Sequence, residues 1–134
     1  MSNLDKLIDK IHKYHRPSDI NDFSSKILKI NVYLFVIDDG SFSSVTEIVL
    51  TNKDRPISVP TISNEGIISG VLYVSKETAI ALKENRFRIA QMRGLNALKM
   101  MCNIKGLNEV VIQGKNAHVS LECSEIERII NKFA

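Results

Sequence analysis

The histidines are the first residues of this sequence whose chemistry could be functional. His12 and His15 lie three residues apart in a stretch that we expect to be helical, and His118 opens a predicted strand. Residues three apart on a helix share one face, and imidazole nitrogen is a common zinc ligand. No Cys, Asp or Glu is spaced so that it obviously completes a ligand set with the pair. The spacing therefore favours a solvated helix face over a metal site.

Asp38 and Asp39 are the second candidates, because they follow directly after an apolar stretch that has the character of a strand. Carboxylates are the ligands that Mg²⁺ prefers in proteins. Gly40 and the serines after it are also typical of an ordinary turn, which we favour. A metal-dependent enzyme at Asp38 and Asp39 is kept as an alternative hypothesis.

Common motifs of catalysis and nucleotide binding do not occur in the sequence. It contains no Gly-x-x-x-x-Gly-Lys-Ser/Thr loop and no Gly-x-Ser-x-Gly motif, and no potential nucleophile has an evident base partner. Cys102 and Cys123 form no Cys-x-x-Cys pair, so a zinc knuckle is not supported. We favour two reduced thiols, with a disulfide left open. We assign no catalytic residue, cofactor or metal, and we expect a protein that is not an enzyme.

The positive charge of the chain is concentrated in one segment. The net charge is only +3, yet seven cations and two anions between Lys76 and Lys105 give that segment a charge of +5. Domains that bind nucleic acid usually carry a larger and more clustered excess of positive charge. The candidate partner-binding residues within the segment are Lys83, Arg86, Arg88 and Arg93.

Arg86 and Arg88 lie two residues apart beside and within a predicted strand, so both should project from one face, opposite Phe87 and Ile89. Two guanidinium groups can bind carboxylates or phosphates bidentately. A solvated sheet edge kept soluble by charge is the first interpretation, and an acidic protein partner is the second. Nucleic acid comes last, because only 6% of the residues are aromatic and none is interleaved with the cations.

The chain has the length and composition of one globular domain, with 134 residues of which 44% are hydrophobic. Helical and alternating periodicities predict the order α-α-β-β-β-β-α-β-α-β-β-α. Such an order indicates an α+β fold with a mixed, mostly antiparallel sheet and helices packed on it. Residues 1–17 are interpreted as a helical extension and 18–134 as the core. Predicted helices cover 3–14, 20–28, 75–84, 95–106 and 124–133, and predicted strands cover 31–37, 47–51, 57–62, 67–74, 87–92, 109–113 and 118–122.

Several of these segments have more specific predictions. The strand at 31–37 is apolar at nearly every position, which favours a central place in the sheet. The strands at 47–51 and 57–62 should form a hairpin, with Pro60 at an edge or in a bulge. Ser75 and Ser124 should be N-caps of the helices that follow them, and Gly106 should be the C-cap of the fourth helix.

The landmarks of this order resemble a known family. Phe23 to Val36 is a helix running into an apolar strand, Tyr73-Val74-Ser75 ends a strand and caps a helix, and Ile104 to Ile112 contains a Gly-Leu turn before another strand. Over residues 18–134 the chain resembles the N-terminal domain of the SseB (enhanced serine sensitivity) family. Gln113-Gly114 stands where that family has Asn-Pro. The resemblance implies a bacterial interaction module without an established enzymatic activity, cofactor or catalytic residue.

These observations lead us to expect a non-enzymatic protein-interaction domain, as an immunity or adaptor protein that binds an acidic partner. A nucleic-acid-binding module using residues 76–105 is the alternative, together with the metal-dependent enzyme described above. Formation of a homodimer is a further hypothesis, because exposed sheet edges pair readily. The sequence has no run of 18 apolar residues and no N-terminal leader pattern, so we expect a cytoplasmic protein without membrane contact.

Overall fold

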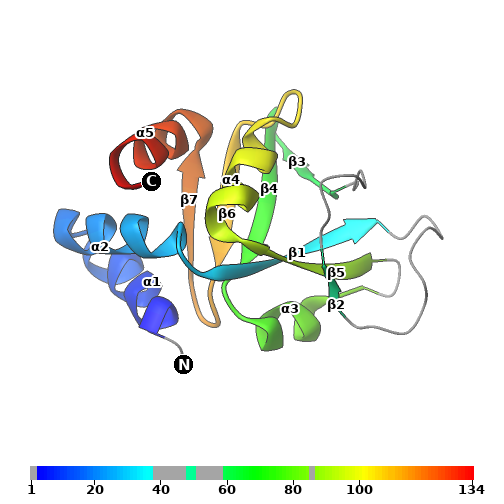
Figure 1. The fold of residues 1–134 in the computed structure, drawn as a ribbon, viewed down its shortest axis with the longest axis horizontal. Coiled ribbons are helices and arrows are strands. Elements are labelled where there is room, and N and C mark those ends of the chain that lie inside the picture. Colours follow the sequence, from blue (N-terminus) through cyan, green and yellow to red (C-terminus); the bar gives the residue numbers. More distant parts are fainter. Residues whose placement is uncertain (1–2, 38–47, 51–58, 85–86) are drawn as a thin grey trace.

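The computed structural model describes residues 3–37, 48–50, 59–84 and 87–134. Within these residues the predicted order of helices and strands is confirmed, and the fold is α+β (Figure 1). The helices are α1 (Asn3–Tyr14), α2 (Pro17–Ile27), α3 (Lys76–Leu82), α4 (Gly94–Cys102) and α5 (Cys123–Phe133). The strands are β1 (Asn31–Ile37), β2 (Ile48–Leu50), β3 (Ile62–Asn64), β4 (Ile67–Tyr73), β5 (Phe87–Arg93), β6 (Glu109–Gln113) and β7 (His118–Glu122).

The strands form one mixed sheet in the order β2-β5-β1-β4-β6-β7, and β3 pairs with β4 beside this path. The β2–β5 and β4–β6 pairs are parallel, and the other pairs are antiparallel. The central position predicted for residues 31–37 is confirmed, because β1 lies between β5 and β4. Its apolar character follows from that position: Val32, Leu34 and Val36 are fully buried on one face, while Tyr33 and Phe35 are partly buried on the other.

The predicted hairpin between residues 47–51 and 57–62 is wrong. β2 instead runs parallel to β5, with Ile48 opposite Ile89. β3 begins at Ile62, two residues after Pro60, which has no N–H to donate to a ladder. β3 then pairs with β4 across Glu65 and Gly66, whose φ angles of 52° and 83° suit the tight two-residue loop of a hairpin. The local turn therefore decides the partner of β3.

Two predicted helix ends also differ from the structure, while one is confirmed. The Thr78 N–H donates to the Ser75 hydroxyl at 3.2 Å, so Ser75 caps α3 as predicted. α4 ends at Cys102 with Asn103 as its C-cap, and Gly106 (φ 84°) belongs to the turn that follows. α5 begins one residue before Ser124, because Glu122 is the N-cap and its N–H donates to the Glu125 carboxylate at 3.2 Å.

The two faces of the sheet are covered unequally. Helices α1, α2, α4 and α5 contribute to the larger hydrophobic core, and we call the sheet face beneath this core the main face. α3 packs on the opposite side, where Ala79 lies in a small cluster with Tyr73 and Ile89, and we call this the α3 face. Figure 1 shows α3 apart from the other four helices. The residues of the larger core are Leu4, Leu7, Ile8, Ile11, Phe23, Ile27, Leu28, Val32, Leu34, Val36, Leu72, Val74, Ala90, Ala97, Leu98, Met101, Leu107, Val110, Ile112, Ala117, Leu121 and Ile126.

Candidate functional site

Of the two histidines that the sequence places on one helix face, only His12 lies within the helix. α1 ends at Tyr14, and His15 follows it with a positive φ of 54°, so His15 does not have the helical backbone that the predicted shared face assumed. His12 lies instead beside His118, with their ring centroids 6.1 Å apart. Across the described part of the chain, no three His, Cys, Asp or Glu side chains are grouped as metal ligands would be. Asp38 and Asp39, the other metal candidates, lie outside the described residues.

The described cations of the basic segment do not gather on one face. Arg88 is paired with Val36, so alternation places Arg88 on the main face, opposite Phe87 and Ile89 as predicted. Arg93 lies five residues along the same strand and therefore projects from the α3 face. The Lys83 ammonium donates to the Phe87 carbonyl oxygen at 3.1 Å, which holds it against the start of β5. Arg86 lies outside the described residues.

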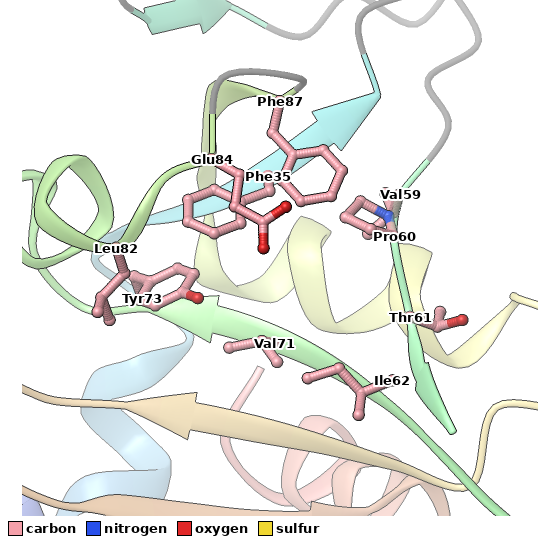
Figure 2. Close-up of a pocket in the computed structure, with 10 residues that line it drawn as sticks. All are labelled: Phe35, Val59, Pro60, Thr61, Ile62, Val71, Tyr73, Leu82, Glu84 and Phe87. Atoms are coloured by element: carbon pink, nitrogen blue, oxygen red, sulfur yellow. The ribbon is translucent and has the colours of Figure 1, made fainter. Parts of the chain in front are cut away.

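A pocket on the α3 face is a site that the sequence did not single out. It has a volume of about 270 Å³ and lies where β1, β4, the α3–β5 connection and the segment before β3 meet (Figure 2). Its lining residues are Phe35, Val59, Pro60, Thr61, Ile62, Val71, Tyr73, Leu82, Glu84 and Phe87.

Three aromatic rings form one wall of this pocket. The Phe35 centroid is 4.8 Å from that of Tyr73 and 5.7 Å from that of Phe87. Register explains the grouping, because Tyr33 pairs with Tyr73 and Ile37 pairs with Phe87, which makes both rings diagonal neighbours of Phe35. Burial raises the pKa of the Tyr73 hydroxyl, as expected for a phenol set among apolar side chains.

The rim of the pocket combines exposed apolar groups with charge. Ile62 is 59% exposed and Leu82 is 54% exposed, although both are large aliphatic residues. Figure 2 shows the Glu84 carboxylate directed into the pocket beside the rings of Phe35 and Phe87. Lys83 is not one of the lining residues, but it lies between Leu82 and Glu84 in the chain and its ammonium donates to the carbonyl oxygen of Phe87, which lines the pocket. The arrangement can bind an apolar group inside and a charged group at the rim.

No protein-family model, curated protein or solved structure matches this chain. The resemblance to the SseB family therefore stays a prediction, and the candidate site is interpreted from its own geometry. None of the helices in the described ranges is long and apolar enough to cross a membrane.

One signal in the sequence could have indicated the pocket. Tyr33, Phe35 and Ile37 on β1 alternate with three valine and leucine residues, so the strand has an apolar stripe on each face. Phe87 and Tyr73 extend the stripe that lies on the α3 face. A seven-residue helix, α3, is too short to cover a stripe that spans three strands. The combination of a two-sided apolar strand and one short covering helix is what leaves large apolar residues at the surface.

Proposed function

We propose that this chain is a non-enzymatic domain that binds another protein through the pocket on its α3 face. The observation that supports the proposal is the group of three rings flanked by the exposed side chains of Ile62 and Leu82. Exposed apolar residues around the rim of a hollow are typical of protein-binding sites. Ile67 is 49% exposed and pairs with Asn64, which lies two residues from Ile62 on β3 and therefore on the same face. Ile67 thus extends the apolar surface toward the β3–β4 turn.

The size of the pocket favours a side chain as its occupant. Pockets for drug-sized ligands and cofactors usually measure about 300–1,000 Å³. At about 270 Å³ this pocket falls just below that range, and it is wide enough for an anchoring side chain such as leucine, methionine or phenylalanine. A protein partner would also cover the exposed rim, which a small ligand held inside the pocket would leave in water.

The charge at the rim bears on the acidic partner that the sequence led us to expect. Lys83 supplies a positive charge next to the pocket, and an Asp or Glu beside the partner's apolar anchor would meet it. Glu84 would oppose a second acidic residue on its own side of the pocket. We therefore propose a partner that presents one apolar side chain with a single flanking carboxylate. An immunity or adaptor role would use such a surface to bind one specific protein.

A library of displayed random peptides tests this proposal without a known partner. Peptides enriched on the immobilised protein are retested on a variant with Leu82→Glu and Ile62→Glu, which places charge on the rim at two exposed positions. The control is Ile20→Glu, a similar change on α2, where Ile20 is 39% exposed and lies away from the pocket. We expect enriched peptides to carry an apolar residue, to lose binding to the double variant by at least tenfold, and to bind the control normally.

The same selection decides the charge requirement and can reject the site. A Lys83→Glu variant should reverse the preference for acidic residues next to the apolar anchor, because the rim charge changes sign. Equal binding of the enriched peptides to the double variant and the control would place the interaction elsewhere. Failure to enrich any peptide above a column without protein would also count against the proposal. Circular dichroism and thermal unfolding of each variant establish that its fold is retained.

A further inference from the structure

The pocket on the α3 face lies where β1 and β3 separate from a shared neighbour, β4 (Figure 2). β1 meets β4 where Tyr33 lies opposite Tyr73. β3 meets the same edge of β4 where Ile62 lies opposite Ser69, because β6 pairs with both Ser69 and Tyr73 from the other edge. Val71 lies midway between these two contacts and lines the pocket. In the described part of the chain, its strand partner is in β6 alone, so the pocket is an opening along the other edge of β4.

Pro60 explains why the sheet divides at this point. Continuing the β3–β4 register by two residues would bring Pro60 opposite Val71, and Pro60 has no N–H with which to extend the ladder. Continuing the β1–β4 register by two residues would bring Phe35 opposite Val71 as well. Two chains cannot both lie beside Val71 at one edge, and neither of them pairs with it. β1 therefore forms one side of the opening, and the segment before β3 forms the other.

The hydrogen-bond pattern of β1 directs the backbone groups of Phe35 and Ile37 away from β5. The Gly94 N–H donates to the Ile30 carbonyl oxygen at 2.7 Å, and these two residues continue the β1–β5 register by one pair. In an antiparallel ladder, hydrogen-bonded pairs alternate with pairs that are not hydrogen-bonded. Residues an even number of positions from Ile30 therefore bond to β5. Phe35 and Ile37 lie an odd number of positions away, so their N–H and C=O groups are directed to the opposite side of β1.

Phe87 supports this direction independently, because it lies opposite Ile37 on β5. The Phe87 N–H donates to the Glu84 carbonyl oxygen at 3.0 Å, and its own carbonyl oxygen accepts from the Lys83 ammonium at 3.1 Å. Both backbone groups of Phe87 are thus used away from Ile37. On its other side β1 pairs with β4 only at Tyr33, among the residues that the structure describes. Backbone donors and acceptors of β1 therefore face the opening.

We propose that the partner binds as an extended segment that adds to β1 as a further strand, and this inference rests on the proposed function of the pocket. The segment pairs with the backbone groups of Phe35 and Ile37, and it places its apolar anchor opposite Phe35. In such strand addition, backbone hydrogen bonds supply affinity and pockets for alternate side chains supply specificity. Directly opposite residues direct their side chains to the same face, so the anchor enters the pocket beside the Phe35 ring.

The volume of the pocket agrees with one residue of an added strand. A residue in a packed sheet occupies roughly 160 Å³, from a rise of about 3.3 Å, a strand spacing of about 4.8 Å and a sheet spacing of about 10 Å. The pocket of about 270 Å³ holds one such residue with a large side chain, and part of its neighbours. The remainder of the segment would lie outside the pocket, along Ile37, which is 42% exposed.

Hydrogen exchange of the free protein, followed by NMR, provides a first test that needs no partner. The amides of Leu34 and Val36 bond to β5, whereas those of Phe35 and Ile37 face the opening. We expect the amides of Phe35 and Ile37 to exchange with deuterium roughly tenfold faster or more than those of Leu34 and Val36. Equal protection of all four amides would show that this edge of β1 is already bonded. That result would overturn strand addition even if peptides bind the pocket.

Backbone N-methylation of the peptides enriched in the library provides the second test. Each nitrogen from two residues before the anchor to two residues after it is methylated in turn, which removes one N–H and leaves the side chains unchanged. In an added strand every second N–H faces β1, so binding should fall roughly tenfold or more at alternate positions and much less at the others. Losses without alternation would overturn strand addition while the proposed function stands. Peptides that bind the variant with Leu82→Glu and Ile62→Glu normally would remove both.

A substitution at Ile37 tests the same pairing from the side of the protein. Ile37→Pro removes an N–H that faces the opening and no hydrogen bond to β5, and Ile37→Val is the control that keeps the N–H. Loss of one hydrogen bond should weaken peptide binding to the proline variant roughly fivefold, whereas the valine variant should bind normally. Circular dichroism establishes that both variants are folded. Equal peptide binding by the two folded variants would overturn the proposed pairing with β1.

Discussion

Replacing Gly94 tests how closely α2 and α4 pack on the main face of the sheet. It is the first residue of α4, and a Cβ built on it would lie 1.7 Å from the carbonyl oxygen of Ile27 and 2.8 Å from the carbonyl carbon. Real Cβ atoms do not approach backbone this closely, so the end of α2 and the start of α4 would have to separate. Ile27 is fully buried, which means that the core would move with it.

We expect Gly94→Ala to lower the free energy of unfolding, whereas the same substitution within an exposed helix usually raises it. In an exposed helix, replacing Gly by Ala stabilises by about 1 kcal/mol. Here overpacking costs about 1–3 kcal/mol, and the separation weakens two backbone hydrogen bonds worth about 1 kcal/mol each. These are the Gly94 N–H to Ile30 carbonyl bond of 2.7 Å and the Leu95 N–H to Leu28 carbonyl bond of 3.2 Å. After the gain of about 1 kcal/mol from the alanine is subtracted, the net loss is about 2–4 kcal/mol from a total stability of about 5–15 kcal/mol.

Urea unfolding followed by circular dichroism measures this loss as a lower midpoint at an unchanged slope. The control is Gly66→Asn, because a Cβ at Gly66 has no atom within 4 Å and asparagine tolerates its positive φ. The control should lose less than about 1 kcal/mol. If Gly94→Ala is as stable as the wild type within about 1 kcal/mol, the close approach of α2 and α4 is not real and the reasoning fails.

Three further predictions concern single polar groups. Asp5→Ala should cost about 1–3 kcal/mol in urea unfolding, because the buried Asp5 carboxylate accepts the Lys115 N–H at 2.8 Å, and Asp5→Asn, which keeps an acceptor, should cost less. Ser75→Ala should cost about 1 kcal/mol through loss of the bond from the Thr78 N–H, and Ser75→Asp should restore most of it. Burial raises the pKa of Tyr73 in the folded state above its unfolded pKa of about 10. The contribution of Tyr73 to stability is therefore fully present below the unfolded pKa and is lost as the pH rises through the folded pKa. Above pH 10, the melting temperature of Tyr73→Phe should accordingly fall less steeply with pH than that of the wild type. Equal slopes for the two proteins would contradict the raised pKa of Tyr73.

The element order was predictable because most elements carry a local signal. The α1 stripe of Leu4, Leu7, Ile8 and Ile11 has helical spacing, and all four residues are buried. The strand at β1 was recognisable from its β-branched and aromatic residues, and its central place followed from its apolar character on both faces. For such segments, local propensity and tertiary packing favour the same structure.

Strand pairing was less predictable, because it depends on contacts between distant segments. β2 and β5 are about 40 residues apart, and nothing in the apolar residues of β2 distinguishes a parallel partner from an antiparallel neighbour. The two-residue turn at Glu65-Gly66 did contain the necessary signal for the β3–β4 hairpin, but the predicted strand ended at Ile62, the residue at which β3 begins. Register rather than periodicity also brings Phe35, Tyr73 and Phe87 together, which is why the pocket was missed.

The energy available at the pocket rim limits how strong the proposed interaction can be without additional contacts. Full burial of an aliphatic side chain is worth about 1.5–3 kcal/mol, and Ile62 and Leu82 are each a little more than half exposed. Covering both would therefore contribute about 1.5–3 kcal/mol, or roughly a tenfold to 150-fold gain in affinity. Such a gain is too small for tight binding by itself, so a partner must also fill the pocket beside the three aromatic rings and pair with Lys83. A specific interaction thus requires the anchor, the rim and the charge together, and loss of any one should be measurable.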